Sequence, residues 1–135
     1  MRVEGQCHCG SITYEAYVEP GKIVICHCAD CQMQSGSAFR MNIPAAAKDF
    51  RVISGKPKKY LKGAPSGARR IHAFCGDCGG PIYSSAEENP QVYSLRVGAL
   101  KQRYELGAPI RQIWTKRRMP WLPHIECTEE FDGQP

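Results

Sequence analysis

The arrangement of the cysteine residues is the feature that most constrains what this chain can fold into. Seven of its eight cysteines fall into three short clusters. The clusters are Cys7-His8-Cys9, Cys26-His27-Cys28-Ala29-Asp30-Cys31 and Cys75-Gly76-Asp77-Cys78, and Cys127 stands alone. The chain begins without the apolar run of a secretory signal, so we expect a cytoplasmic protein in a reducing environment that favours metal sites over disulfides. Thiolates two or three positions apart on a tight turn suit a tetrahedral ion, and zinc is the expected metal.

The spacing divides these ligands into two sets. Four sulfurs form a closed set that is expected to hold a structural zinc and to join the amino-terminal turn to a distant hairpin: Cys7, Cys9, Cys75 and Cys78. Three sulfurs remain for a second zinc with one open position, the arrangement of a catalytic metal: Cys26, Cys28 and Cys31. In the alternative interpretation Cys127, His27 or His8 supplies a fourth ligand and closes the second site. Either way, we expect two zinc ions per chain.

The pattern outside the cysteines predicts one all-β domain over residues 1–135 with very little helix. In Ser11–Val18 the apolar side chains Ile12, Tyr14, Ala16 and Val18 alternate with polar ones, the period of a half-buried strand. Further strands are expected at 23–25, 38–43, 50–53, 59–62, 70–74, 81–84, 92–97 and 112–115, separated by turns rich in the 13 glycines and 10 prolines. One helical turn is expected after Pro44. No apolar stretch is long enough to span a membrane.

The positive charge gives little support to a nucleic-acid partner. Bound zinc would lower the formal charge of +5, because seven ligand thiols lose their protons and only two divalent ions are added. Six basic residues and no acidic ones lie between 56 and 70, which predicts a solvated hairpin or, alternatively, an anion-binding lip near Cys75. Trp114 and Trp121 beside Lys116-Arg117-Arg118 are expected in the core rather than in a nucleic-acid surface. His8, His72 and His124 are interpreted as ordinary surface or turn residues, and Cys127 as a spare thiol.

The motifs also resemble a known family, over residues 5 to about 121. They are Gly5-Gln6-Cys7-His8-Cys9-Gly10-Ser11-Ile12, Cys26-His27-Cys28-Ala29-Asp30-Cys31, Ser35-Gly36-Ser37-Ala38-Phe39, Ser54-Gly55-Lys56-Pro57, Phe74-Cys75-Gly76-Asp77-Cys78-Gly79, Ile113-Trp114 and Pro120-Trp121. In this order and spacing they are similar to the glutathione-dependent formaldehyde-activating enzymes, also called the centromere-protein-V-like zinc domain. The sequence departs from the family at Gln32-Met33 and at Gln112, where the family often has a basic residue and a histidine.

The resemblance implies a fold, a metal assignment and an activity. The fold would be the Mss4-like arrangement of twisted antiparallel sheets. The resemblance assigns the four-sulfur set to the structural zinc and the three-sulfur set to the catalytic zinc. It also implies a carbon–sulfur lyase reaction that joins glutathione to formaldehyde as S-hydroxymethylglutathione.

Two hypotheses of function follow from these observations. The first is a zinc-dependent enzyme that handles the adduct of a small-molecule thiol, such as glutathione, and a small electrophile, with its chemistry at Cys26, Cys28 and Cys31. A zinc ion held by three thiolates has a net charge of −1 and suits an added thiol that becomes a thiolate. The second is a non-catalytic zinc-stabilised module that binds a protein or a nucleic acid. An open second site favours the first hypothesis, and a closed one favours the second.

Overall fold

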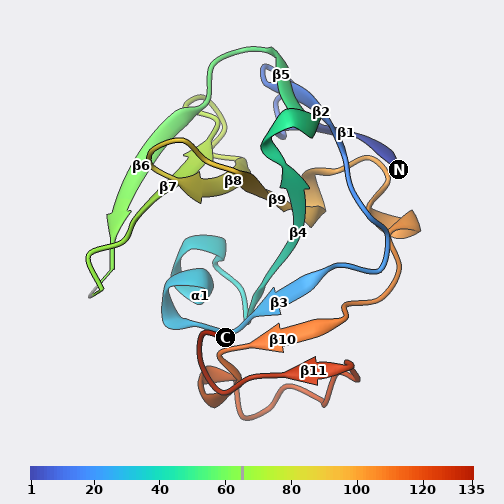
Figure 1. The fold of residues 1–135 in the computed structure, drawn as a ribbon, viewed down its shortest axis with the longest axis vertical. Coiled ribbons are helices and arrows are strands. Elements are labelled where there is room, and N and C mark those ends of the chain that lie inside the picture. Colours follow the sequence, from blue (N-terminus) through green and yellow to red (C-terminus); the bar gives the residue numbers. More distant parts are fainter. Residues whose placement is uncertain (65) are drawn as a thin grey trace.

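The computed structural model describes residues 1–64 and 66–135, and strands account for most of its regular structure (Figure 1). The strands are β1 (Arg2–Gln6), β2 (Thr13–Tyr17), β3 (Val24–Cys26), β4 (Arg40–Ala46), β5 (Phe50–Ser54), β6 (Lys58–Gly63), β7 (Arg69–Phe74), β8 (Pro81–Ala86), β9 (Val92–Arg96), β10 (Arg111–Ile113) and β11 (Glu129–Glu130). The helical elements are α1 (Ala29–Ser35) and the short 3₁₀ turns Ala47–Asp49, Val97–Ala99, Arg103–Glu105 and Thr115–Arg117. This confirms the predicted all-β fold with little helix.

The strands form two sheets. The smaller has the order β1-β2-β5, and the larger has the order β11-β10-β3-β4-β9-β8-β7-β6. Within the larger sheet β10 runs parallel to β3 and to β11, and the other neighbours are antiparallel. Figure 1 shows the larger sheet bending around α1, so that β3 and β4 lie on one side of the helix and the β6–β7 hairpin on the other. An ion pair of 2.5 Å between Lys62 of β6 and Asp30 of α1 joins the hairpin to the helix.

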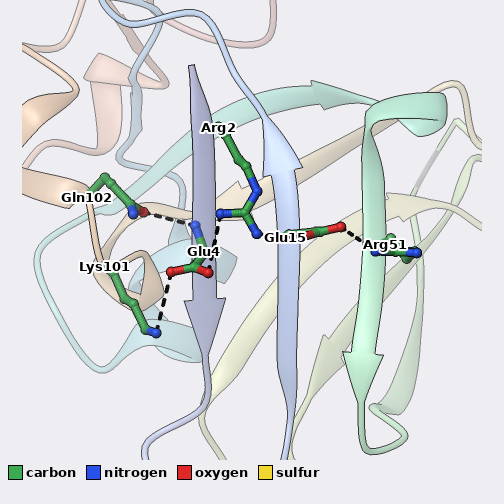
Figure 2. Close-up of polar contacts among 6 residues, drawn as sticks. All are labelled: Arg2, Glu4, Glu15, Arg51, Lys101 and Gln102. Carbon is green, nitrogen blue, oxygen red and sulfur yellow. Dashed lines mark hydrogen bonds and ion pairs between the residues drawn. The ribbon is translucent and has the colours of Figure 1, made fainter.

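A hydrophobic core connects the two sheets. It takes Val3, Ile12, Tyr14, Ala16 and Val18 from the amino-terminal segment and Ile43, Ile82 and Leu95 from the larger sheet. The predicted alternation along 11–18 is confirmed, because its four apolar side chains are all buried. The opposite face of the smaller sheet carries charged side chains, with Glu15 accepting hydrogen bonds of 2.6 Å from both Arg2 and Arg51 (Figure 2).

The expected strands are present with small shifts at their ends, but four segments differ from the prediction. The strands Arg2–Gln6 and Glu129–Glu130 and the helix Ala29–Ser35 were not predicted. The helical turn expected directly after Pro44 begins at Ala47 instead, because Pro44–Ala46 continue β4 and pair with β9. In the segment that the structure describes, no helix is both long and apolar enough to cross a membrane.

Candidate metal centres and the adjoining cavity

The first cysteine cluster lies where the turn after β1 meets the turn after β7. The sulfur atoms of Cys7, Cys9, Cys75 and Cys78 all lie within 4.8 Å of one another. The Sγ atom of Cys9 is 3.7 Å from that of Cys7 and 3.8 Å from that of Cys75. Four sulfurs bound tetrahedrally at about 2.3 Å from one ion would be about 3.8 Å apart, whereas a disulfide needs about 2.05 Å. The donor set and its spacing therefore fit a closed, four-sulfur zinc site.

Backbone N–H groups and a hydroxyl prepare these sulfurs for the thiolate form. Ile12 N–H donates to the Sγ of Cys7 at 3.3 Å, and Asp77 N–H donates to that of Cys75 at 3.4 Å. Burial works against the charged form of Cys7, but hydrogen bonds from Ile12 N–H and the Ser11 hydroxyl outweigh burial and lower the pKa of Cys7 to about 6. The turns can aim their N–H groups this way because a glycine with positive φ follows each cysteine pair: Gly10 at 81° and Gly79 at 75°.

The second cluster surrounds the beginning of α1. Cys26 ends β3, Cys28 is the residue that caps the helix, and Cys31 lies in the first helical turn. Their three sulfurs lie within 4.8 Å of one another. The backbone N–H of Cys31 donates to the Sγ of Cys28 at 3.3 Å. Hydrogen bonds from the thiols of Cys26 and Cys31 lower the pKa of Cys28, which favours the thiolate form of this sulfur.

The structure brings none of the three alternative fourth ligands into this cluster. Across residues 1–64 and 66–135, no histidine, cysteine or carboxylate joins the three sulfurs within the same distance. His27 is fully buried, and its Nε2 lies 2.8 Å from Oε1 of Gln112. The amide of Gln112 in turn donates to the carbonyl of Ile125 at 2.7 Å. His27 follows β3 and is joined through its hydrogen bond to Gln112 of β10. Position 112 is the one at which the sequence departs from the histidine of the similar family.

Two arginines lie buried between the cysteine clusters. Arg40 is 7% exposed and Arg96 is 6% exposed. Both guanidinium groups approach one ring nitrogen of a histidine, since Nη2 of Arg96 is 3.1 Å and Nη1 of Arg40 is 3.5 Å from Nδ1 of His72. Burial and the nearby arginines lower the pKa of His72 to about 4. The interpretation of His72 as an ordinary surface residue is therefore wrong: it is a neutral, half-buried acceptor in a cationic environment.

These residues line two cavities beside α1. One has a volume of ≈ 450 Å³ and is lined by Arg40, His72 and Arg96 together with Met33, Tyr60 and Phe74. The other, of ≈ 560 Å³, shares both arginines and extends to Cys7 and His8. Cys26, Cys28 and Cys31 do not line either cavity, but Arg40 lines both and pairs with Cys26 across β3 and β4. Cavities of this size could hold a small organic molecule one residue away from the second cluster.

Sequence reasoning missed Arg40, Arg96 and His72 as site residues, although a signal for them is present. Arg40 and Asn42 alternate with apolar residues along β4, as Ser94 and Arg96 do along β9. Such alternation normally predicts a solvent-facing polar edge. Here α1 covers that face, and the seven residues of the helix do not by themselves show which face they cover.

Comparisons with known proteins agree with the cysteine pattern and the fold. The profile of the family described as "Glutathione-dependent formaldehyde-activating enzyme" matches residues 2–117. A Schizosaccharomyces pombe protein described as an "Uncharacterized lyase" is 30% identical over 98 residues, which cover 73% of this chain and 68% of that protein. A crystal structure of a Rhodobacter sphaeroides protein superposes with a TM-score of 0.62 at 26% identity, over 78% of this chain and 96% of the other.

Proposed function

The chain belongs to the glutathione-dependent formaldehyde-activating enzyme family, and from that premise we propose that it is a metal-dependent enzyme of the carbon–sulfur lyase type. Its substrate would be the adduct of a small thiol and a small electrophile, with glutathione and formaldehyde as the default pair and S-hydroxymethylglutathione as the adduct. The fission yeast relative described as a lyase supports the reaction type. The adjoining cavity supports a small-molecule substrate over a macromolecular one.

We assign the two metals to the two cysteine clusters. Cys7, Cys9, Cys75 and Cys78 would hold a structural zinc, and Cys26, Cys28 and Cys31 would hold the catalytic one. A divalent ion at the second cluster would act as a Lewis acid and would favour the thiolate form of an added thiol. The protein's own contribution is to bring the three sulfurs together and to favour the thiolate form of Cys28, which accepts from the first turn of α1.

The surrounding residues have defined roles in this proposal. Arg40 lies directly opposite Cys26 in the pairing of β3 with β4, so its positive charge lies beside the sulfur cluster and favours negatively charged sulfur there. Gln34 of α1 accepts a hydrogen bond of 3.0 Å from the Arg40 guanidinium and fixes its position. The apolar side chains of Met33, Tyr60 and Phe74 line the same cavity, and they would reduce the access of water to a bound adduct.

One observation carries the proposal: three sulfurs converge, and among the described residues no fourth protein ligand joins them. Cobalt substituted for zinc tests this, because sulfur-to-cobalt charge transfer reports on each bound thiolate. Glutathione added to the cobalt protein should change this spectrum. The change should be absent in Cys28→Ser, which lacks one ligand of the second cluster, while the spectrum of the four-sulfur site remains.

A spectrum that is indifferent to saturating glutathione, in a protein that holds two cobalt ions, would contradict the proposal. The same result would favour the alternative of a zinc-stabilised binding module. Metal analysis provides the control, since wild-type protein should hold two ions per chain and Cys28→Ser one.

A further inference from the structure

The register of the larger sheet brings polar side chains from five strands onto one face. Arg40 pairs with Cys26, and Asn42, two residues further along β4, pairs with Arg96. Ser84 of β8 pairs with Ser94 on one side and with His72 on the other. Because paired residues share a face and alternate residues return to it, this row extends from β3 to β7. Its opposite face carries the buried row Ile43, Leu95, Tyr83 and Ala73.

Among residues 1–64 and 66–135, the arginines in this row have no acidic partner. Arg96 donates to the side-chain amide oxygen of Asn42 at 2.5 Å, and Arg40 donates to that of Gln34 at 3.0 Å. Arg70 donates to the hydroxyl of Ser84 at 3.3 Å. All three acceptors are neutral. Within the part of the chain that the structure describes, none of these arginines forms an ion pair, and the buried Nε of Arg96 has no hydrogen-bond partner.

The second cysteine cluster cannot neutralise this charge once it holds an ion. Three thiolates around a divalent cation leave a single net negative charge, against three guanidinium groups. Burial lowers the pKa of Arg96 to about 9, with a further contribution from the charge of Arg40, which is the cost of holding these groups together without an anion. Leaving a buried guanidinium unpaired is costly, so an arrangement of this kind calls for a ligand that brings negative charge.

We propose that Arg40 and Arg96, with His72 between them, form a subsite for a carboxylate of the thiol substrate. The proposal rests on the proposed function, because it assigns the recognition of the molecule whose sulfur would bind at the second cluster. Guanidinium groups match carboxylates in geometry and form stronger hydrogen bonds with them than with neutral acceptors. His72 is a positioning residue, since its Nδ1 accepts from both arginines and holds the two guanidinium groups side by side.

The subsite predicts which thiols the protein prefers. A thiol that carries a carboxylate should bind more tightly than an uncharged thiol of the same length. The matched probes are 3-mercaptopropionate and 3-mercapto-1-propanol, and the readout is the charge-transfer spectrum of the cobalt protein. Charge-assisted hydrogen bonds lead us to expect about tenfold tighter binding of the carboxylate, or more. This comparison uses the wild-type protein and depends on no variant folding correctly.

Variants of the arginines then test whether Arg40 and Arg96 cause the preference for the thiol that carries a carboxylate. Arg96→Gln and Arg40→Gln should each reduce the advantage of 3-mercaptopropionate over the uncharged thiol about tenfold. Arg40→Gln should also weaken the binding of both thiols, because Arg40 favours negatively charged sulfur at the second cluster, so the ratio of the two affinities is the quantity compared. Arg96→Lys keeps the charge but loses the planar, two-pronged donor, so it should retain part of the advantage. Arg51→Gln removes the same charge from an exposed site on the smaller sheet and serves as the matched control, with no expected effect. Cobalt content and circular dichroism verify that each variant is folded and loaded.

Each outcome has a distinct meaning. Equal binding of both thiols by the wild-type protein would overturn the subsite and leave the proposed function in place. An advantage that survives in both Arg96→Gln and Arg40→Gln, or that disappears equally in Arg51→Gln, would also overturn the subsite. A wild-type cobalt spectrum that responds to neither thiol would instead overturn the proposed function, and the substrate assignment of the subsite with it.

Discussion

At the scale of single residues, the site contains two side chains, Cys28 and His72, whose pKa values are lowered by their surroundings. The thiolate form of Cys28 is favoured because neighbouring thiols and the first turn of a helix donate to it. His72 is neutral because burial and adjacent guanidinium groups disfavour its protonated form. In both cases the cause is a hydrogen-bonding and charge environment assembled from separate strands and a helix, so a substitution of one partner should change the properties of the other.

The neutrality of His72 predicts how stability depends on pH. Its pKa is about 4 in the folded protein, against an ordinary value of 6.5. As the pH falls between these values the unfolded chain takes up a proton that the folded protein does not, so His72 makes folding less favourable. The positive groups that disfavour the proton are Arg96, Arg40, Lys62 and Arg70.

The variant His72→Gln removes this effect while keeping an acceptor. Its loss of stability relative to wild type should therefore be smaller at pH 5 than at pH 7.5, as measured by urea unfolding of both proteins. Acid weakens cysteine-bound metal in both proteins alike, so the difference between them isolates the histidine. A deficit that is equal at the two pH values, or larger at pH 5, would contradict the neutral state of His72.

At the scale of elements, short segments are held by packing and by their ends rather than by their own propensity. The seven-residue helix α1 has no buried residue, begins at the Cys28 cap and ends at Gly36 with φ of 63°. Strand β1 contacts the core through Val3 and through Gly5, which pairs with Tyr14 of β2. The position of Gly5 leaves no room for a side chain, because a Cβ there would lie 2.1 Å from the Tyr14 ring.

This contact predicts a selective effect of alanine. Gly5→Ala should destabilise the protein by about 1–3 kcal/mol, since the buried Tyr14 ring has to shift against a packed core. Gly63→Ala is the matched control: Gly63 also lies in a strand, and a Cβ there would meet nothing within 4 Å. Urea unfolding of the two variants measures the difference, and equal midpoints would contradict the close packing of β1 on β2.

At the scale of the whole molecule, the four-sulfur cluster joins parts of the chain that are far apart in sequence. Cys7 and Cys9 follow the first strand of the smaller sheet, and Cys75 and Cys78 follow β7 of the larger one. The core cluster also takes residues from both sheets, and on these grounds we propose that residues 1–135 form one domain. The second cluster, in contrast, lies within one local segment around the start of α1.

The two clusters should therefore contribute differently to stability. Cys75→Ser should lose most of the cooperative folding, because metal bound between distant segments contributes its binding energy to folding. Cys28→Ser should remain folded and lose one metal ion, because its ligands are local. Thermal unfolding together with metal analysis distinguishes the two variants, and similar melting of both would contradict the division into a structural and a catalytic site.

The sequence by itself determined the features that depend on local pattern. The cysteine spacing separated a four-sulfur set from a three-sulfur set, and the structure assembles both sets of sulfurs. Alternating apolar residues predicted the strands, because the side chains of a strand alternate between its faces whatever lies beyond it. The resemblance of the motifs led to the family, and the family profile confirms it.

Only the tertiary structure decided what covers each face and which distant groups meet. Alternation in β4 and β9 shows that Arg40 and Arg96 share a face, but it does not show that α1 covers it or that His72 of β7 lies between them. The absence of a fourth ligand from the second cluster in the described residues likewise depends on His27 bonding to Gln112 of a distant strand. Strand pairing joins residues that are many positions apart, and the free energy of those contacts is not encoded in any single segment.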